Sequence, residues 1–579
     1  MIPCYSCTFI EPARFAVPYA SPSLQQRDDV DICPQSPALY PKRHADLLRS
    51  IDSASNSSEF RTWAQQNLQG AIRIPTETFD DLGPPGQDPR WESRLKFHEY
   101  LSGRFPFVRA NLNRTVVNHY ALVYHWQGSD ELLKPMLLTA HQDTVPVDTN
   151  SIDQWVNPPF SGELDDDEWI WGRGSSDCKS VVIGLLTAVE SLLKHGFAPA
   201  RSIVLAFGMD EESGGAYGGP AVRDYLLRSY GKDGFFMLVD EGTQFAERNG
   251  TVYAQPGIAE KGMMTVQMNV TTPGGHSAVP PRHTSIAFLS LLLAELDSQP
   301  LPPHLYRNSS HFQSLECSAQ HDPEISSHLR SLIMDARRSD ASLSVLQEEL
   351  LHTDPLFQTI VSTTQAVTVI RGGIKFNALP TEALATIDHR IADWSSMADL
   401  KSHYISLISP LASKLGLTFD AFGESIVSTS KVVNRSPQGH LQVVQVNGAG
   451  REPSPVSPTL GSAPWEILSG TILATLKSSL EGNYNDMNMI AQPTFIGVGN
   501  TDTGHYWDLT KNIYRYAHLQ EGHSQGEHGI NEAIRTGAYL EIVRFLIRLI
   551  LNADETADYV EDKNAMTPAQ KSARGGVHR

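Results

Sequence analysis

The sequence predicts an α/β fold with a mostly parallel sheet, interrupted by a separate α+β domain. Three apolar runs with helical stretches between them predict neighbouring strands of that sheet: 135–143, 202–212 and 235–241. From about residue 259 the pattern changes to strands in which apolar and polar residues alternate. This change predicts a second domain inserted into the first.

The predicted order of segments follows from these changes of pattern. We expect a flexible lead-in over 1–30, the first part of the α/β domain over 31–258, an inserted α+β lid domain over 259–455, the second part of the α/β domain over 456–552 and a polar tail over 553–579. The lid domain should contain a four-stranded sheet and a polar helical insertion over 301–356. A Pro-rich stretch, Glu452–Pro458, marks the return to the α/β domain.

Composition restricts the classes of function. A chain of 579 residues is too long for a single core. Its net charge of −19 argues against nucleic acid as a partner, since phosphate binding requires clustered Lys and Arg. No run of 18 apolar residues encodes a stable membrane span. The odd count of five cysteines leaves at least one unpaired.

Two signals for location conflict. The N-terminus lacks the basic start and unbroken apolar core of a signal peptide. Six N-x-S/T sequons nevertheless occur, at Asn56, Asn113, Asn249, Asn269, Asn308 and Asn434. Either an entry signal is missing from the sequence or the sequons are unused. We therefore expect a vacuolar or secreted protein, with a cytoplasmic location as the alternative.

The three apolar strands all end in acidic or metal-binding residues, in the patterns HQD, DEE and DE. Ligands of parallel α/β sheets collect outside the carboxyl ends of the strands. One histidine and six carboxylates should therefore converge there: His141, Asp143, Asp210, Glu211, Glu212, Asp240 and Glu241. Because so many acids repel one another without cations, the pattern favours a metal centre with two ions.

Each motif alone has a plainer interpretation. Asp210–Glu212 could be a solvated acidic turn, and Asp177 could cap the helix predicted over 181–193. In the H-x-D pattern, His141 can ligate a metal while Asp143 holds its other ring nitrogen. Gly522–Gly526 matches the G-x-S-x-G pattern of serine hydrolases, but no buried strand precedes Ser524. A serine nucleophile is therefore disfavoured.

Together, eight stretches resemble the M20 family of dinuclear zinc peptidases, most closely its carboxypeptidase S (Gly-X carboxypeptidase) branch. These stretches occur in family order: LLTAHQDTVPV, GRGSSDCK, FGMDEESGG, LVDEG, GGHSAVPP, GGIKFNALP, GNTDTGHYWDLTKNIYR and HGINE. The resemblance covers roughly residues 30–550. It implies a zinc-peptidase domain carrying an inserted lid and dimerisation domain.

The resemblance also implies a role for each matching residue. One zinc would be held by His141, Asp177 and Asp240, and the second by Asp177, Glu212 and His528. Glu211 would be the general base, with Asp143 orienting His141. In the lid domain, His276 would stabilise the transition state, and Asn377 and Arg390 would bind the substrate carboxylate.

We therefore predict a carboxypeptidase with two zinc ions per subunit that removes C-terminal residues from short peptides. The alternatives are an N-acyl amino acid hydrolase or synthase and, from another class, a non-catalytic metal-binding protein. The resemblance leaves two alternatives for the oligomeric state: a homodimer through the lid domain, in which His276 acts across subunits, or a surface covered instead by the insertion over 301–356. Gly504 departs from the family pattern, which leads us to expect a basic residue there; this departure concerns substrate preference.

Overall fold

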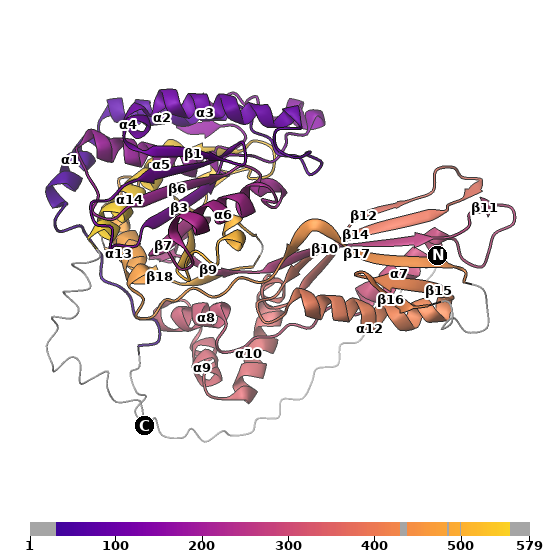
Figure 1. Ribbon diagram of the computed structural model, residues 1–579. Coiled ribbons are helices and arrows are strands. Elements are labelled where there is room, and N and C mark those ends of the chain that lie inside the picture. The colour runs from indigo at the N-terminus through magenta and orange to yellow at the C-terminus, as the bar shows by residue number, and fades with distance from the viewer. Residues whose placement is uncertain (1–30, 429–436, 483, 485, 498, 556–579) are drawn as a thin grey trace, which may run out of the picture. The chain divides into compact units, whose positions relative to one another are not determined.

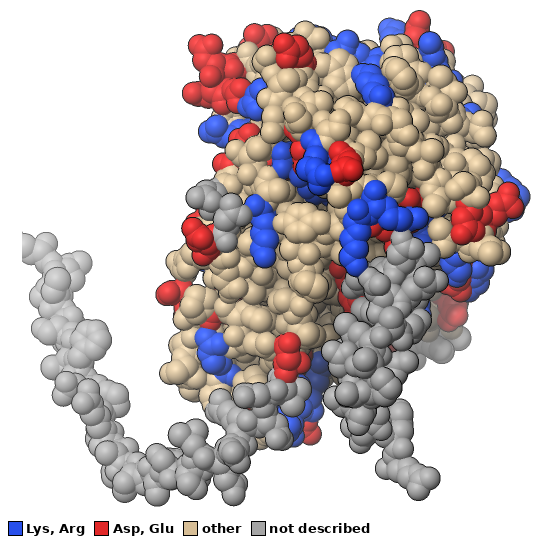
Figure 2. Space-filling view, turned by 90° about the vertical axis from the view of Figure 1, so that its left-hand side faces the viewer, with Lys and Arg blue, Asp and Glu red and all other residues tan. Residues whose placement is uncertain are grey.

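The computed structural model describes residues 31–428, 437–482, 484, 486–497 and 499–555 (Figure 1). The lead-in predicted over 1–30 and most of the tail predicted over 553–579 lie outside these residues. No described helix is long and apolar enough to cross a membrane. On the face shown in Figure 2, acidic and basic side chains are interspersed with uncharged ones.

The fold is mixed α/β, as predicted, and its larger sheet has ten strands. Its central strands β6 (Ile203–Gly208), β3 (Met136–His141), β7 (Met237–Arg248) and β20 (Ile513–Gln520) are parallel neighbours. The expectation that no buried strand precedes Ser524 was wrong, because β20 is buried; Ser524 nevertheless begins another strand and not the helix that a nucleophile elbow requires. Antiparallel pairing adds β2 (Ala121–Trp126) and β1 (Asn113–Val117) beside β6. The remaining strands are β8 (Thr251–Ala254), β9 (Gly257–Glu260), β18 (Asn488–Ala491) and β19 (Thr494–Ile496).

Apolar side chains cover both faces of this sheet. Leu138 and Leu205 join the core formed with α5 (Lys179–Lys194), α13 (Ala463–Lys477) and α14 (Thr536–Asp554). Their neighbours Leu137 and Val204 join a different core, which includes α6 (Gly218–Tyr230). This alternation explains why the central strands are uniformly apolar, since both of their faces are buried.

The described N-terminal region begins with two helices, α1 (Ala45–Ser55) and α2 (Ser58–Ile72). The side chain of Ser57 accepts a hydrogen bond from the Phe60 amide and thereby begins the second helix. The helices α3 (Ser93–Arg104) and α4 (Pro106–Asn111) follow. Short elements β4 (Glu163–Leu164), β5 (Trp169–Trp171), β21 (Ser524–Gln525) and β22 (Ala533–Arg535) form a separate small sheet.

The second sheet lies wholly within the residues predicted to form the lid domain. Its order is β12 (Thr364–Gly372), β14 (Glu382–Ile391), β10 (Gly262–Thr271), β17 (Gly439–Arg451), β15 (Leu417–Ala421) and β16 (Glu424–Val427). The expectation of four strands was wrong by two: β15 pairs in parallel with β17, and the chain then reverses at Phe422 and Gly423, both with positive φ, and adds β16 beside β15. Helices α7 (Ser285–Ser298) and α12 (Met397–Leu415) pack on this sheet, and β11 (Gly275–His276) pairs with β13 (Ala378–Leu379).

The polar insertion is a helical subdomain with its own core, formed by α8 (Ser310–His321), α9 (Ser327–Ala336), α10 (Asp340–Thr353) and α11 (Phe357–Val361). A disulfide joins Cys317 of α8 to Cys33. Among the described cysteines, Cys178 is unpaired and buried. The sequence indicated an unpaired cysteine but not this pairing.

Candidate metal and substrate site

The ends of β3 and β6 place the first candidate residues side by side. His141 ends β3 opposite Gly208 of β6, and η3 (Glu211–Ser213) begins three residues after Gly208. The carboxylate of Asp143 accepts hydrogen bonds from the amides of Glu211 and Glu212, each at 3.2 Å. Asp143 also lies 3.3 Å from His141 Nδ1. It thus fixes both the imidazole and the turn that carries the two glutamates.

Two imidazoles converge on the carboxylate of Asp177. His141 Nε2 lies 2.9 Å from Oδ1, and His528 Nε2 lies 2.9 Å from Oδ2. Each imidazole has a further acid beside it: Glu241 Oε1 at 3.3 Å from His141, and Glu212 Oε2 at 3.1 Å from His528. Each imidazole thus has two carboxylates beside it, and Asp177 is common to both. His141, Asp177 and Glu212 offer ligand atoms within 4.8 Å of one another, as do His141, Cys178 and Glu241, so the cluster is suited to divalent cations.

Within β7, Glu241 contacts this cluster in place of the expected Asp240. Glu241 lines the same cavity as Asp177, whereas Asp240 is buried, does not line the cavity and has an Oδ2 with no hydrogen-bond partner among the described residues. Burial and the Glu241 charge raise the pKa of Asp240 to about 7. Because successive side chains of a strand point to opposite faces, only one of these neighbours can face the histidines.

The electrostatics of the site match a place for cations. Hydrogen bonds to Asp177 and Glu212 raise the pKa of His528 to about 10. Burial raises the pKa of Glu212 to about 7 and that of Glu211 well above its usual value. Cations bound beside the two imidazoles would stabilise the ionised form of these carboxyl groups, whose pKa values are raised without them.

A carboxylate that sequence reasoning did not assign supports Asp177. Glu532 is fully buried and accepts hydrogen bonds from the amides of Gly174, Ser176 and Asp177, at 3.0, 2.9 and 3.1 Å. It also pairs with Arg173 Nη1 at 2.6 Å. The sequence indicated Glu532 only through its place as the last residue of the HGINE stretch. Asp210, in turn, accepts from the amides of Tyr217 and Gly218 at the start of α6, a supporting position.

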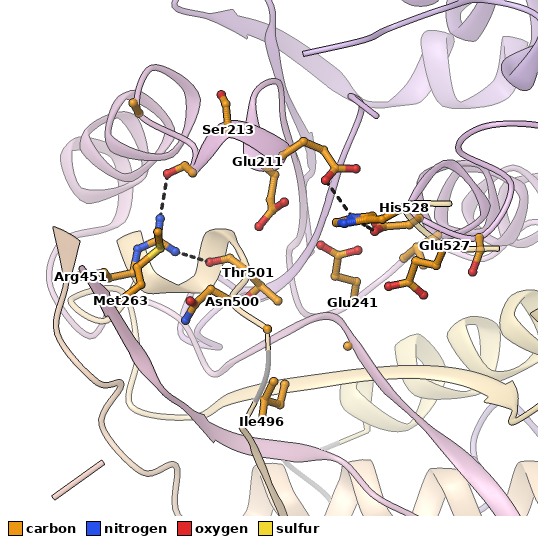
Figure 3. A pocket seen from close by; sticks show the side chains of 18 of the residues that line it. Glu211, Ser213, Glu241, Met263, Arg451, Ile496, Asn500, Thr501, Glu527 and His528 are labelled. Carbon is orange, nitrogen blue, oxygen red and sulfur yellow. Dashed lines mark hydrogen bonds and ion pairs between the residues drawn. The ribbon is translucent and has the colours of Figure 1, made fainter. Parts of the chain in front are cut away.

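A cavity of about 1020 Å³ opens beside the cluster and is lined by both sheets (Figure 3). Glu211, Glu212, Glu241 and His528 line it from the large-sheet side, and Arg390 and Arg451 line it from the lid sheet. His276 and Asn377 do not line it; both are exposed, and the backbone of Asn377 accepts from the Ser277 amide in the β11–β13 region. The structure therefore brings Arg390, but neither of the other two lid residues, to the cluster within one chain.

The model of peptidase family M20/M25/M40 matches residues 137–552, which include every strand end described above. The chain belongs to this family. The match confirms the predicted resemblance and enzyme class, a metallo-carboxypeptidase of the M20 type. Members of this family depend on metal ions, so the histidine–carboxylate cluster is the natural candidate for the metal centre.

Among relatives of this M20 chain, Carboxypeptidase S of Saccharomyces cerevisiae is 34% identical over 517 residues, which span 88% of this chain and 87% of the relative. The human N-fatty-acyl-amino acid synthase/hydrolase PM20D1 is 31% identical over 506 residues, 86% of this chain and 89% of the relative. The two relatives thus differ in the activity that their names state.

Solved structures confirm the fold of an M20 domain carrying an inserted domain. Human carnosine dipeptidase 1 superposes with a TM-score of 0.60 at 14% identity, covering 89% of this chain and all of that one. The metallo-carboxypeptidase Sso-CP2 of Sulfolobus solfataricus gives 0.55 at 16% identity, covering 85% and 99%. At these identities the likeness concerns the fold alone.

Proposed function

We propose that this chain is a dinuclear zinc carboxypeptidase that removes C-terminal residues from short peptides of the Gly-X type. One observation carries the proposal: two imidazoles contact the two oxygens of Asp177, each with a further carboxylate beside it, at the edge of a cavity that also holds a guanidinium. The family supports the class of reaction, and the cavity supports a substrate with a free carboxylate.

The donor set supports one change to the expected ligands. We assign His141, Asp177 and Glu241 to one ion, and Asp177, Glu212 and His528 to the other, with Asp240 behind Glu241. Zinc bound there would supply Lewis acidity to the scissile carbonyl and make water easier to deprotonate. The turn of Glu212 and the loop of Asp177 are held by the buried carboxylates of Asp143 and Glu532, which preorganises these ligands.

Glu211 is suited to move the proton. It lines the cavity and has no ion-pair partner among the described residues, whereas its neighbour Glu212 contacts His528. Its carboxylate would accept a proton from the attacking water and deliver it to the departing amine nitrogen. Burial and the nearby acids raise the pKa of Glu211, so its carboxyl group can hold the proton between these two steps.

Arg390 is the proposed contact for the substrate carboxylate. Its Nη1 donates to Asn500 Oδ1 at 2.9 Å and its Nε donates to Asp388 at 3.2 Å, which orients the guanidinium within the cavity. A guanidinium held in this way can bind a carboxylate with two parallel hydrogen bonds.

A homodimer would account for the position of His276 and Asn377. The helix α7, the edge strand β12 and the loop that follows β12 expose apolar side chains: Ile286, Leu291, Val367, Ile370, Ile374 and Phe376. Such a patch is typical of an interface. We propose that a second copy covers it, and that His276 and Asn377 of one copy then complete the site of the other.

The dimer proposal is tested by mixing two inactive variants, Glu211→Gln and His276→Ala. A mixed dimer contains one site with an intact Glu211 and an intact His276 from the other chain. Exchange of subunits should therefore restore roughly a quarter of wild-type activity. Sedimentation of Phe376→Asp should show a monomer. No recovery on mixing, or a monomeric wild-type protein, contradicts the proposal.

A specific observation favours a second substrate class. Ile496, Leu519 and Ile542 give the cavity an apolar wall, and the PM20D1 relatives carry the name of an N-fatty-acyl-amino acid synthase/hydrolase. The zinc-loaded chain should be assayed in parallel on a Gly-Leu derivative and on N-oleoyl-leucine. Faster turnover of the Gly-Leu derivative supports the peptidase, faster turnover of the oleoyl substrate supports the alternative, and turnover of neither supports a non-catalytic metal-binding protein.

We further propose a vacuolar lumenal or secreted location. The Cys33–Cys317 disulfide fits an oxidising compartment. Four of the five described sequon asparagines are exposed and the fifth, Asn269, is half-buried; Asn434 lies outside the described residues. Glycosidase treatment of the native protein should lower its apparent mass. Unchanged mass, together with free thiols at Cys33 and Cys317, would support the cytoplasmic alternative.

A further inference from the structure

Two arginines from the lid sheet enter the cavity side by side. Met263 of β10 pairs in register with Arg390 of β14 on one side and with Arg451 of β17 on the other. Directly opposite residues of antiparallel strands point to the same face, so the two arginines flank Met263, with Cα atoms about 10 Å apart. All three residues line the cavity.

The two guanidinium groups converge on neighbouring residues of one loop. Arg390 Nη1 donates to the side chain of Asn500. Arg451 Nη1 donates to the carbonyl of Thr501 at 2.8 Å (Figure 3). Both guanidinium groups are positively charged and line one cavity, so an anion bound between them would be attracted by both.

The two arginines differ in how their charge is balanced. Asp388 pairs with Arg390, whereas Arg451 forms no ion pair with any acid of the described chain. Its Nη2 donates to the carbonyl of Gly214 and to His505 Nε2, both at 2.9 Å. These acceptors are neutral: burial and the Arg451 charge lower the pKa of His505 to about 4. The pair of arginines with Asp388 thus carries one uncompensated positive charge.

Gly504 makes room for this arrangement. A Cβ at position 504 would lie 2.7 Å from both Nε and Nη1 of Arg451, closer than side-chain atoms approach one another. Only a glycine at 504 therefore allows the Arg451 guanidinium to lie against the loop of Thr501.

We propose that Arg451 binds the free α-carboxylate of the substrate together with Arg390, and that it determines how strongly the enzyme requires that carboxylate. The inference rests on the proposed function. One carboxylate matches the single uncompensated charge. The neutral acceptors fix the Arg451 guanidinium beforehand, so little side-chain entropy is lost on binding. Nε–H and the second Nη1–H are not used by these three acceptors and remain to bind the ligand.

The test compares the hydrolysis of a blocked Gly-Leu peptide with that of its C-terminal amide. Arg451→Gln should raise KM for the acid about 10- to 100-fold, because a charge-assisted contact is lost, and should lower kcat/KM for the amide by a much smaller factor. Leucine binding to Glu211→Gln should weaken by a similar factor when Arg451→Gln is added, whereas leucinamide binding should not change. An equal loss for acid and amide would show that Arg451 only holds the lid against the Gly214 turn, and would overturn the proposal.

A second variant tests the shared space without removing the charge. Gly504→Ala should displace Arg451 and reduce the preference for acid over amide. Adding Gly504→Ala to Arg451→Gln should cause no further loss of that preference, since both changes act on one contact. Independent, additive losses contradict the inference. A wild-type chain that hydrolyses neither the peptide acid nor N-oleoyl-leucine refutes the proposed function itself, a distinguishable result.

Discussion

The two sheets of this protein contribute to the same cavity in different ways. In the large-sheet domain, His141 at the end of β3, the turn after β6 and Glu241 within β7 meet in one chain, and the buried carboxylates of Asp143 and Glu532 accept hydrogen bonds from the amides of Glu211, Glu212 and Asp177. The lid sheet supplies one row of side chains across three strands, formed by Arg390, Met263 and Arg451. Its edge strand β12 is largely exposed, and so are His276 and Asn377 outside this sheet. The difference teaches that the chemistry is preorganised by the large sheet, whereas recognition is divided among separate elements.

Removal of Asp177 should have the largest effect, because both proposed ions share it. Asp177→Ala should lose bound zinc and reduce turnover about 10⁴-fold or more. The matched lid variant, Arg390→Ala, should keep its zinc and mainly raise KM. Elemental analysis beside steady-state kinetics checks both. If Asp177→Ala retains two ions, the assignment of Asp177 as the shared ligand is wrong.

Loss of the disulfide should weaken the tie between Cys33 and the helical insertion. The double variant Cys33→Ser/Cys317→Ser should lose about 2–5 kcal/mol of stability, since the unfolded chain regains the freedom that the cross-link removes. Thermal melting with and without a reductant measures this. Reduction should lower the melting temperature of the wild type and leave that of the variant unchanged; equal melting temperatures for reduced and oxidised wild type contradict the prediction.

Glu532→Gln tests whether the large sheet preorganises the metal site. The change removes the charge that pairs with Arg173 and accepts from three amides around Asp177. Zinc affinity or turnover should fall about 10- to 100-fold, as for other groups that orient a ligand. The exposed Glu521 offers a control, and Glu521→Gln should be neutral. Similar values for both variants would count against preorganisation.

Acid should destabilise both sheets through one buried histidine each. Burial lowers the pKa of His518 on β20 to about 3 and that of His389 on β14 to about 4. Both stay neutral when folded but become protonated when unfolded, below about pH 6.5. Each should therefore cost about 1.4 kcal/mol of stability per pH unit as the pH falls from about 6.5 toward its folded pKa. Denaturant unfolding at several pH values should show a shallower slope for His389→Gln, which keeps a partner for the Tyr404 hydroxyl. An unchanged slope contradicts this sign.

Sequence patterns predicted the parts of the site that depend on strand ends. The apolar runs and their terminal acids located His141, Asp143, Glu211 and Glu212 at one sheet edge, because parallel strands end together. The choice between Asp240 and Glu241 could not be predicted, since it depends on where the pleat of β7 falls relative to the histidines.

Longer-range features left weaker signals. The pairing of Cys33 with Cys317 spans 284 residues, and spacing alone does not determine such a bond. Arg451 lies beyond an irregularity in the β10–β17 pairing, where simple alternation no longer predicts which residue faces Met263. The close approach of Arg451 to Gly504 depends on how the two residues meet in the fold, so the sequence alone does not indicate it.

The central claim is that the large sheet holds two ions and that Glu211 moves the proton. The most direct test measures zinc content and turnover of wild type and Glu211→Gln prepared in parallel without chelators. Two zinc ions per chain are expected in both proteins, with turnover lowered about 10²- to 10⁴-fold in the variant alone. Full turnover in Glu211→Gln, or a metal content near zero in the wild type, would contradict the account.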